Sequence, residues 1–482
     1  MHKKVLLINP RKGWRPALGL LYLAAYLRKF GHTIKVCEFI DEVYFPHANT
    51  SLWHEIKTFS PDVIGLGIIS WNRRVALEII DRLHREHPNT TIICGGKDPT
   101  FKPEIYLASH VDYVVKGEGE ETIRALLNTL DNPTEIFGIR GLAFLRDGKP
   151  HDTGQREPMD VSTVPFPAFD LVNYDHYCDI RLGGIPGHFI RTGFIMATRG
   201  CPYKCRFCTD PIRSIYRERP LDDIIAEIRW QMTTWKIDGL VFLDDLFYHD
   251  EKKVVEFCQR ILAEKIHLKL YAQTRVDRVG SEETLQLMKQ AGFIQIALGV
   301  ETGSQRLLDI INKGTKLHQI RTAIERINKA GICTYAFLII GFPEETRDDL
   351  EATIQFLQES RPTFVAVNFF MPMPGTAYYR QEDEQILNEL SFSLTENQQQ
   401  FRSPVPAADL LSYRDRLTAL AEKNANLHLL RYPSFVIWTM KVILFRPDVL
   451  LRGIRLQWQR GIYVSYFDAI RTAMINHRIF GI

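Results

Sequence analysis

Short apolar runs alternate with stretches of helical spacing over the first 130 residues. The runs Val5–Ile8, Ile34–Phe39 and Val63–Ile69 are almost wholly apolar, which is typical of strands buried on both faces of a parallel sheet. Between the first two, apolar residues at helical spacing run from Leu18 to Phe30 and stop at Gly31, a residue type that commonly follows the last helical turn. This alternation predicts a doubly wound, Rossmann-like α/β domain. The same pattern predicts strands at Thr91–Cys94 and Asp112–Val115 and helices at Val75–Arg85 and Glu120–Leu130.

A second alternating series follows a looser segment. Residues 136–185 contain Pro165-Phe166-Pro167 among polar runs, with a small hairpin at Ile139–Phe144, and we interpret them as a linker between a domain of residues 1–135 and the rest. Six apolar strands separated by amphipathic helices then predict a partial or complete parallel barrel within residues 186–400, before a helical and aromatic region at 401–482. The six predicted strands are Phe194–Ala197, Gly239–Leu243, Lys269–Gln273, Ile294–Gly299, Tyr335–Ile340 and Val365–Phe369.

Composition favours a folded protein of two or three domains. The chain has 482 residues, too many for one hydrophobic core, and 45% of them are hydrophobic while 24% are charged. Its formal net charge of +3 gives no general case for a nucleic-acid partner. The run Val5–Ile8 is too short for a signal peptide. The segment Phe435–Phe445 contains Lys441 and is shorter than the ~20 apolar residues of a transmembrane helix. We therefore expect a cytoplasmic protein without a membrane span.

Three of the eight cysteines, Cys201, Cys205 and Cys208, fall within eight residues, while the others lie far apart. This distribution indicates one metal site in a reducing compartment rather than a disulfide framework. The three cysteines follow the first predicted barrel strand directly, in the kind of loop where barrel active sites lie. Three thiolates without a nearby fourth cysteine leave one iron of a small cluster open to an external ligand. The alternative is a structural zinc site completed by a remote histidine or by Cys178.

The loop from Cys201 to Cys208 has the pattern CxxxCxxC with an aromatic residue, Phe207, before its last cysteine. It resembles the cluster loop of the radical S-adenosylmethionine (SAM) superfamily. The resemblance implies a [4Fe–4S] cluster on the three cysteines, Phe207 beside the cofactors, and SAM bound through its amino and carboxylate groups at the open iron. It also implies reductive cleavage of SAM to a 5′-deoxyadenosyl radical that abstracts hydrogen from a substrate. An external electron donor such as flavodoxin or ferredoxin is then expected.

Later strand ends resemble the rest of a SAM pocket in this superfamily. Asp244 and Asp245 end the second barrel strand, at the family's position for the SAM amino group, where Gly-Gly-Glu is commoner. Glu301 lies in a segment that resembles the ribose and carboxylate contact, and Gly341 opens a turn that resembles the one near the adenine. The alternatives are a helix N-cap for Asp244 and a simple turn at Gly341. Two more polar residues end the third strand and face SAM, substrate or solvent: Gln273 and Arg275.

The first domain resembles the cobalamin-binding domain that precedes the radical SAM barrel in one large subclass. The resemblance is carried by Leu18–Leu27, Pro61–Gly65, Gly95-Gly96 and Asp112–Glu120, in matching order and spacing. Paired glycines after a strand let the backbone approach a large flat ligand, so Gly95 and Gly96 are expected at the cofactor. The turn Lys116-Gly117-Glu118 is expected at its nucleotide tail.

The lower face of cobalamin is expected to lack a histidine ligand. Where histidine-ligating cobalamin domains have Asp-x-His-x-x-Gly, this sequence reads Asn9-Pro10-Arg11-Lys12-Gly13-Trp14. Trp71, which follows the third strand, is expected to cover that face, and a core or surface role is the alternative. Loss of cobalamin binding with the fold retained also stays open.

Together the resemblances imply a cobalamin-dependent radical SAM enzyme with a Rossmann-like domain, a (βα)6 partial TIM barrel and a C-terminal helical region. The implied reaction is a methyl relay from SAM through cobalamin to a small-molecule substrate, at an unactivated carbon. Two alternatives remain: an oxidative cyclase or rearranging enzyme on the same scaffold, and a non-catalytic sensor that binds SAM or cobalamin.

The C-terminal region is basic. Residues 401–482 contain 12 Lys and Arg against 5 Asp and Glu, a local net charge of +7, with aromatic residues between them. Such helices bind the surface of an anionic membrane, or cover the barrel mouth and bind a hydrophobic, lipid-like or anionic substrate. The alternative is a helical cap with a solvated basic face.

Overall fold

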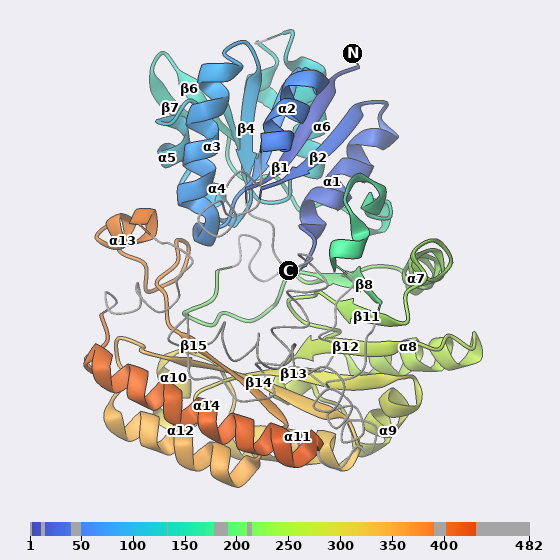
Figure 1. The fold of residues 1–482 in the computed structure, drawn as a ribbon, viewed down its shortest axis with the longest axis vertical. Helices are drawn as coiled ribbons and strands as arrows, with labels where there is room; N and C mark the ends of the chain where they lie inside the picture. The colour runs from blue at the N-terminus through green and yellow to red at the C-terminus, as the bar shows by residue number, and fades with distance from the viewer. Residues whose placement is uncertain are drawn as a thin grey trace, which may run out of the picture. The chain divides into compact units, whose positions relative to one another are not determined.

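The computed structural model describes residues 2–10, 15–39, 50–132, 134–177, 191–209, 215–389 and 402–429. The chain divides into two compact units (Figure 1). The three segments of the first unit are Met1–Tyr177, Arg199–Asp223 and Met371–Phe401, and those of the second are Cys178–Thr198, Ile224–Phe370 and Arg402–Ile482. The loop with the three cysteines therefore belongs to the first unit.

Seven strands of the described chain form the sheet of the first unit, in the order β2-β1-β3-β4-β5-β6-β7. Strands β1 to β5 are parallel, and β6 and β7 form a hairpin that pairs with β5 antiparallel. The predicted doubly wound α/β fold is confirmed. The strands are β1 (Lys4–Asn9), β2 (Thr33–Glu38), β3 (Val63–Gly67), β4 (Thr91–Gly95), β5 (Tyr113–Val115), β6 (Leu142–Arg146) and β7 (Lys149–Asp152).

Helices cover both faces of this sheet. On one face, Ile56 of α2, Ile79 of α3 and Tyr106 of α5 join a core with Leu6 and Ile64 of the central strands. On the other face, α1 packs against β1, β2 and α6. Burial on both faces explains why these strands are apolar at successive positions rather than at every second one. The helices are α1 (Leu18–Lys29), α2 (Thr50–Phe59), α3 (Arg73–Glu86), α4 (Lys97–Phe101), α5 (Pro103–Leu107), α6 (Glu120–Thr129) and, from the last segment of the unit, α13 (Asp383–Glu389).

Six parallel strands form the sheet of the second unit, in the order β15-β14-β13-β12-β11-β8. This order has two free ends among the described residues, so the sheet is a partial barrel of six βα repeats rather than a closed one of eight. Its strands are β8 (Thr192–Ile195), β11 (Gly239–Phe242), β12 (Lys269–Thr274), β13 (Phe293–Glu301), β14 (Cys333–Ile340) and β15 (Phe364–Phe369).

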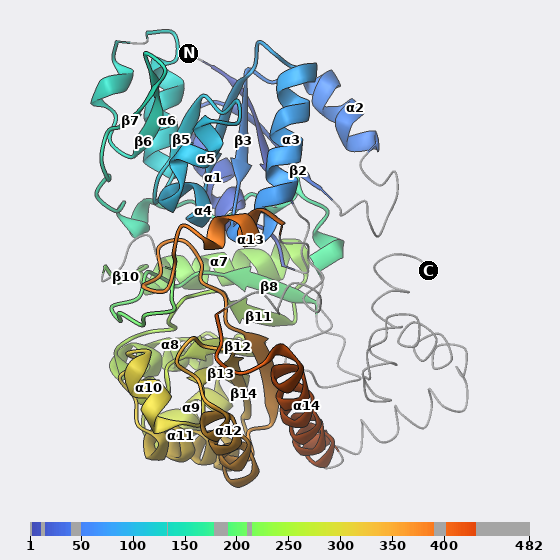
Figure 2. The ribbon, with the colours of Figure 1, turned by 90° about the vertical axis from the view of Figure 1, so that its left-hand side faces the viewer.

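Helices α8, α9, α11, α12 and α14 follow one another along this sheet, each in contact with the next (Figure 2). Inside, the rings of Phe242, Phe247, Phe257 and Phe293 pack against each other between β11, β13 and α8. The helices are α7 (Leu221–Trp235), α8 (Glu251–Ala263), α9 (Glu282–Gln290), α10 (Gln305–Ile310), α11 (Leu317–Lys329), α12 (Arg347–Ser360) and α14 (Ala407–Leu429).

The predicted helical character of residues 401–482 is observed over α14. Residues 430–482, which carry most of the basic and aromatic residues noted above, lie outside the described part of the chain, as does the segment Phe435–Phe445. Within the described part, no helix combines the length and the apolar character that crossing a membrane requires.

Candidate cofactor sites

The cysteine loop lies between two short paired strands of the chain, β9 (Thr198–Arg199) and β10 (Arg217–Glu218). At its start, Gly200 has φ +82°, and a Cβ at this position would lie 2.1 Å from the carbonyl oxygen of Ile215. Only glycine tolerates that conformation together with such a close approach of two backbone segments. The two ends of the loop are therefore held against each other at Gly200 and Ile215.

Within the loop, Cys205 is buried, Cys201 is half-buried and Cys208 is exposed. The backbone N–H of Cys208 donates to the carbonyl oxygen of Cys205 at 3.3 Å, and Phe207 between them is half-buried. In the described part of the chain, no three His, Cys, Asp or Glu side chains converge as ligands of a single metal ion. A [4Fe–4S] cluster does not need such a convergence, because each of its thiolates binds a different iron. Cys178, the alternative zinc ligand, lies outside the described residues.

The other described cysteines have a different character from the loop cysteines. Cys37, Cys94, Cys258 and Cys333 are buried in strands or helices. Burial raises the pKa of Cys37 and Cys258 to about 12 and that of Cys333 to about 11. Buried thiols of this kind do not ionise near neutral pH and so are poor metal ligands.

At the end of β11, Asp244 is buried and only partly hydrogen-bonded. The backbone N–H and the hydroxyl of Thr198 both donate to its Oδ1, the hydroxyl at 2.7 Å, whereas its Oδ2 has no partner among the described residues. Burial raises the pKa of Asp244 to about 7. The N-cap of the following helix α8 is Asp250, so Asp244 is not a helix cap. Its neighbour Asp245 is exposed.

The residues at the end of β12 are bonded within the protein. The Gln273 side-chain amide donates to the carbonyl oxygen of Asp244. Arg275 is 6% exposed; its Nε lies 2.9 Å from Asp277 and its guanidinium donates to the carbonyl oxygen of Lys313 at 2.6 Å. Arg275 is therefore a buried, bonded group and not a solvated charge.

Glu301, at the end of β13, is held by a residue that the sequence pattern did not single out. The Nζ of Lys313 donates to Glu301 Oε1 at 2.6 Å, and both side chains are buried. Glu301 has φ +67°, at a register shift between β13 and β14 that begins at Gly299. A non-glycine residue in this conformation is uncommon and indicates a local constraint on the strand end. Lys313 lies in the loop after α10, where no periodicity or spacing marks it.

After β14, Gly341 has φ +89° and its N–H donates to Glu345 Oε2. Glu345 is buried, and burial raises its pKa to about 8, while its Oε1 has no partner among the described residues. The Glu345 side chain thus closes the turn. Like Asp244, Glu345 is a buried acid with one carboxyl oxygen that has no partner among the described residues.

In the first unit, the glycine pair is tightly packed. Gly96 has φ +110°, and a Cβ there would lie 2.3 Å from the carbonyl oxygen of Ile68, so the close approach is made by the protein's own backbone. Trp71 is half-buried, and Ile69 beside it is 46% exposed. These two apolar side chains lie beyond the carboxyl end of β3, where open α/β sheets bind their ligands.

The turn after β5 is bonded to other parts of the first unit. Lys116 pairs with Asp152 at 2.5 Å, and the N–H of Gly117, at φ +73°, donates to the hydroxyl of Thr100 at 3.0 Å. Glu118 accepts hydrogen bonds from Arg217 and from the backbone N–H of Met159. The three residues expected at the nucleotide tail thus already have protein partners.

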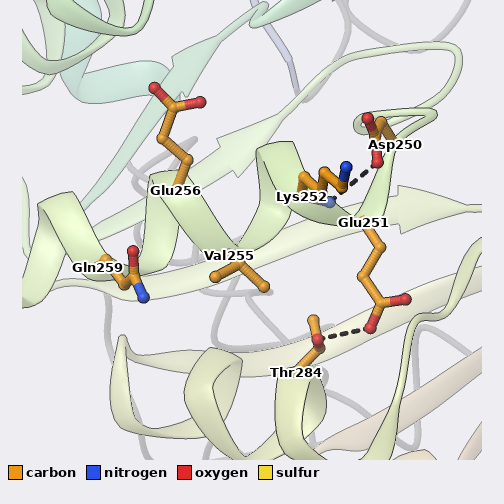
Figure 3. A pocket seen from close by; sticks show the side chains of 7 residues that line it. All are labelled: Asp250, Glu251, Lys252, Val255, Glu256, Gln259 and Thr284. Atoms are coloured by element: carbon orange, nitrogen blue, oxygen red, sulfur yellow. Dashed lines mark hydrogen bonds between the residues drawn. The ribbon is translucent and has the colours of Figure 1, made fainter.

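A shallow groove of about 460 Å³ lies at the N-terminal part of α8 (Figure 3). Glu251 accepts a hydrogen bond from the hydroxyl of Thr284 at 2.6 Å across it. None of the predicted site residues lines this groove, so we assign no cofactor to it. The lining residues are Asp250, Glu251, Lys252, Val255, Glu256, Gln259 and Thr284.

Two family models match the chain. The radical SAM superfamily matches residues 195–357, and the B12-binding domain matches residues 4–127. The chain therefore carries a radical SAM domain and a B12-binding domain. Every residue predicted above to hold a cofactor lies within one of these two ranges.

Several known proteins are similar to this chain over most of its length. An uncharacterized methyltransferase of Pyrococcus horikoshii is 29% identical over 444 residues, 91% of this chain and 90% of that protein. The anaerobic magnesium-protoporphyrin IX monomethyl ester cyclase of Cereibacter sphaeroides is 28% identical over 383 residues, 77% of this chain and 61% of that protein. The solved structure of TsrM, a radical SAM methyltransferase from Kitasatospora setae with cobalamin and a [4Fe–4S] cluster bound, matches with a TM-score of 0.65 at 20% identity and covers 80% of this chain and 78% of that chain.

The radical SAM and B12-binding domains imply SAM, a [4Fe–4S] cluster and cobalamin as cofactors. The described residues fit them. The loop offers three cysteines as its sulfur donors, and the unpartnered buried oxygen of Asp244 is suited to a cationic amino group. The exposed apolar side chain of Ile69 beside Trp71 gives the B12-binding domain an apolar surface at the carboxyl end of its sheet.

Proposed function

We propose that this chain is a cobalamin-dependent radical SAM methyltransferase that acts on an unactivated carbon of a small molecule. The observation that carries the proposal is the presence, in one chain, of a three-cysteine radical SAM loop and a B12-binding domain. When bound, the reduced cluster supplies the electron that cleaves SAM, and cobalamin supplies the methyl group for transfer.

Different residues of the chain are assigned to the cluster and to the parts of SAM. We assign Cys201, Cys205 and Cys208 to the cluster, each through its thiolate. Asp244 offers Oδ2 to the SAM ammonium, and Thr198 fixes the carboxylate through two hydrogen bonds to Oδ1. Glu301, held in place by Lys313, is assigned to the ribose.

Two further positions complete the proposed SAM and cobalamin sites. We assign the Gly341 turn to the adenine, where Glu345 closes the backbone. We assign Trp71 to the lower face of cobalamin, next to the exposed Ile69. Both assignments follow from the position of these residues beyond the carboxyl ends of parallel strands.

The substrate is proposed to be hydrophobic or lipid-like. The basic, aromatic segment at 401–482 supports this proposal through its composition, which suits an anionic or apolar ligand or the surface of a membrane. An external one-electron donor such as flavodoxin or ferredoxin is proposed to reduce the cluster.

An oxidative cyclase is the second candidate, because the cyclase of Cereibacter sphaeroides is 28% identical over 77% of this chain. Methyl transfer is favoured, since the methyltransferase of Pyrococcus horikoshii matches 91% of this chain and 90% of its own length.

The test uses protein reconstituted with iron and sulfide under anaerobic conditions and incubated with dithionite, cobalamin and SAM labelled in its methyl group. A methyltransferase forms S-adenosylhomocysteine together with 5′-deoxyadenosine. If 5′-deoxyadenosine forms without any S-adenosylhomocysteine, the methyl-transfer proposal is wrong and the cyclase branch is supported.

A further inference from the structure

Glu118 in the turn after β5 is a mostly buried acid, and both of its oxygens accept hydrogen bonds inside the first unit. Its carboxylate lies 2.8 Å from each of the two terminal nitrogens of Arg217, in a two-pronged contact. Arg199 donates to the same carboxylate at 3.2 Å, and the backbone N–H of Met159 donates at 2.9 Å. The Glu118 side chain is only 12% exposed, so solvent screens these contacts weakly.

The two arginines stand on the two strands that enclose the cysteine loop. Arg199 in β9 comes two residues before Cys201, and Arg217 in β10 follows the loop. Glu118 therefore holds both ends of the loop at once. The close backbone approach of Gly200 to Ile215 lies between the two arginines along the same pair of chain segments.

A second acid and a backbone group complete the arrangement. Arg199 also donates to Glu120 at 2.7 Å, and Arg217 donates to the carbonyl oxygen of Met159 at 2.7 Å. Two carboxylates thus face two guanidinium groups, and the charges balance. The four side chains are 7 to 16% exposed, so the set is costly to break, because removal of one member leaves an uncompensated charge in a weakly solvated place.

The geometry suits positioning rather than ligand binding. A two-pronged arginine–carboxylate contact fixes orientation as well as distance. Burial opposes ionisation of Glu118, but the hydrogen bonds from Arg217 and the charge of Arg199 outweigh it and hold the pKa of Glu118 below its ordinary value. A carboxylate whose oxygens already accept four hydrogen bonds has little capacity left for a cofactor.

We propose that Glu118 is a positioning residue of the cluster loop: through Arg199 and Arg217 it fixes the two ends of the loop, and so the placement of the three cysteine thiolates. This assignment replaces the nucleotide tail of cobalamin as the partner of Glu118. It rests on the proposed function only in assuming that Cys201, Cys205 and Cys208 bind the cluster.

The test compares Glu118→Gln with Glu121→Gln, a matched control in the first turn of α6. Glu121 makes a partly exposed contact with Arg156 at 3.4 Å. Both variants and the wild type are reconstituted with iron and sulfide. Three quantities are then measured on the same samples: the rate of iron loss to a ferrous chelator, the electron paramagnetic resonance spectrum of the dithionite-reduced protein with and without SAM, and the cobalamin affinity by absorbance titration.

We expect E118Q to lose iron about tenfold faster than wild type and to show an altered spectrum, because the charged hydrogen bonds that hold the loop ends are gone. Its cobalamin affinity should stay within about twofold of wild type, and E121Q should match wild type throughout. Weakened cobalamin binding with an unchanged cluster would overturn the proposal in favour of a nucleotide-tail role. An E118Q protein whose cluster and cobalamin affinity both match those of the wild type would also overturn the proposal.

A second variant guards against a simple folding defect. Arg217→Lys keeps the positive charge but loses the two-pronged contact, so it should fold and still shift the cluster spectrum in the same direction as E118Q. An R217K protein with a wild-type spectrum and wild-type iron loss would contradict the proposal. If the wild-type protein itself assembles no cluster, the proposed function fails, which is a different outcome from any difference between variants.

Discussion

Glu118 in the first unit, which is partly exposed, and Asp244 in the second, which is buried, are both acids that follow parallel strands, yet their surroundings differ. Both oxygens of Glu118 are bonded to guanidinium or backbone groups, and its pKa is lowered by them against the effect of burial. Among the described residues Asp244 has hydrogen-bond partners at Oδ1 and none at Oδ2, and burial raises its pKa to about 7. The difference teaches that a place at a strand end does not define a role; the partners already present decide it.

A buried carboxyl group with an unsatisfied oxygen lowers the stability of the fold. Such groups are common where a ligand completes the bonding, so perturbed acids of this kind are candidates for binding sites. This argument supports the proposals that Asp244 binds a ligand and that Glu118 holds the cysteine loop in place.

The largest expected effect is on stability at Glu118. E118Q should lose about 3 kcal/mol of unfolding free energy, because it leaves Arg199 and Arg217 short of a buried partner. The loss should be the same at pH 5.5 and pH 8, since the lowered pKa of Glu118 in the folded state and its ordinary value near 4.5 both lie below this range. Urea unfolding at the two pH values measures it. Equal stability of E118Q and the E121Q control would contradict the claim that Glu118 stabilises the fold through Arg199 and Arg217.

The effect of Asp244 on stability, unlike that of Glu118, should depend on pH in this range. Its pKa is higher in the folded state, about 7, than the ordinary value of 3.8, so the folded state binds more protons between these values and wild-type stability falls as pH rises toward 7. Asp244→Asn removes this dependence. In protein without SAM, the unfolding free energy of D244N relative to that of the wild type should therefore rise by about 2 kcal/mol between pH 5.5 and pH 8. A difference that stays constant across this range contradicts the account of Asp244.

An effect of similar size is expected on SAM affinity. D244N places an amide N–H₂ or a neutral oxygen where an anionic oxygen is proposed to meet the SAM ammonium, and should weaken SAM binding about thirtyfold. The exposed neighbour variant, Asp245→Asn, should change it less than about twofold. Equilibrium dialysis of SAM with cluster-loaded protein measures both. Equal losses in the two variants would show that the amino group is not bound at Asp244.

The fold was predictable from the sequence where local pattern controls it. The apolar runs Val5–Ile8 and Val63–Ile69 correspond to β1 and β3, and the series from Phe194 to Phe369 corresponds to the six strands of the second unit. Short helices such as α4 and α5 were not predicted, because five residues are too few to show a period.

The candidate site was predictable only in part. The three cysteines and the strand-end acids are visible because spacing and position along the chain mark them. The partners Lys313 of Glu301 and Arg217 of Glu118 are not, since they join positions 12 and 99 residues apart through tertiary contacts. The positioning role proposed for Glu118 rests on such a contact, whereas the sequence pattern predicts this residue at the nucleotide tail of cobalamin.

The central claim is that Cys201, Cys205 and Cys208 hold a cluster that cleaves SAM. The most direct measurement is the yield of 5′-deoxyadenosine from SAM by anaerobically reconstituted, dithionite-reduced protein, for the wild type and for the Cys201→Ala, Cys205→Ala and Cys208→Ala variants. The account predicts product from the wild type and none from the three variants, together with loss of the brown cluster absorbance. Product from any of the variants, or a wild-type protein that contains one zinc ion and forms no 5′-deoxyadenosine, would contradict it.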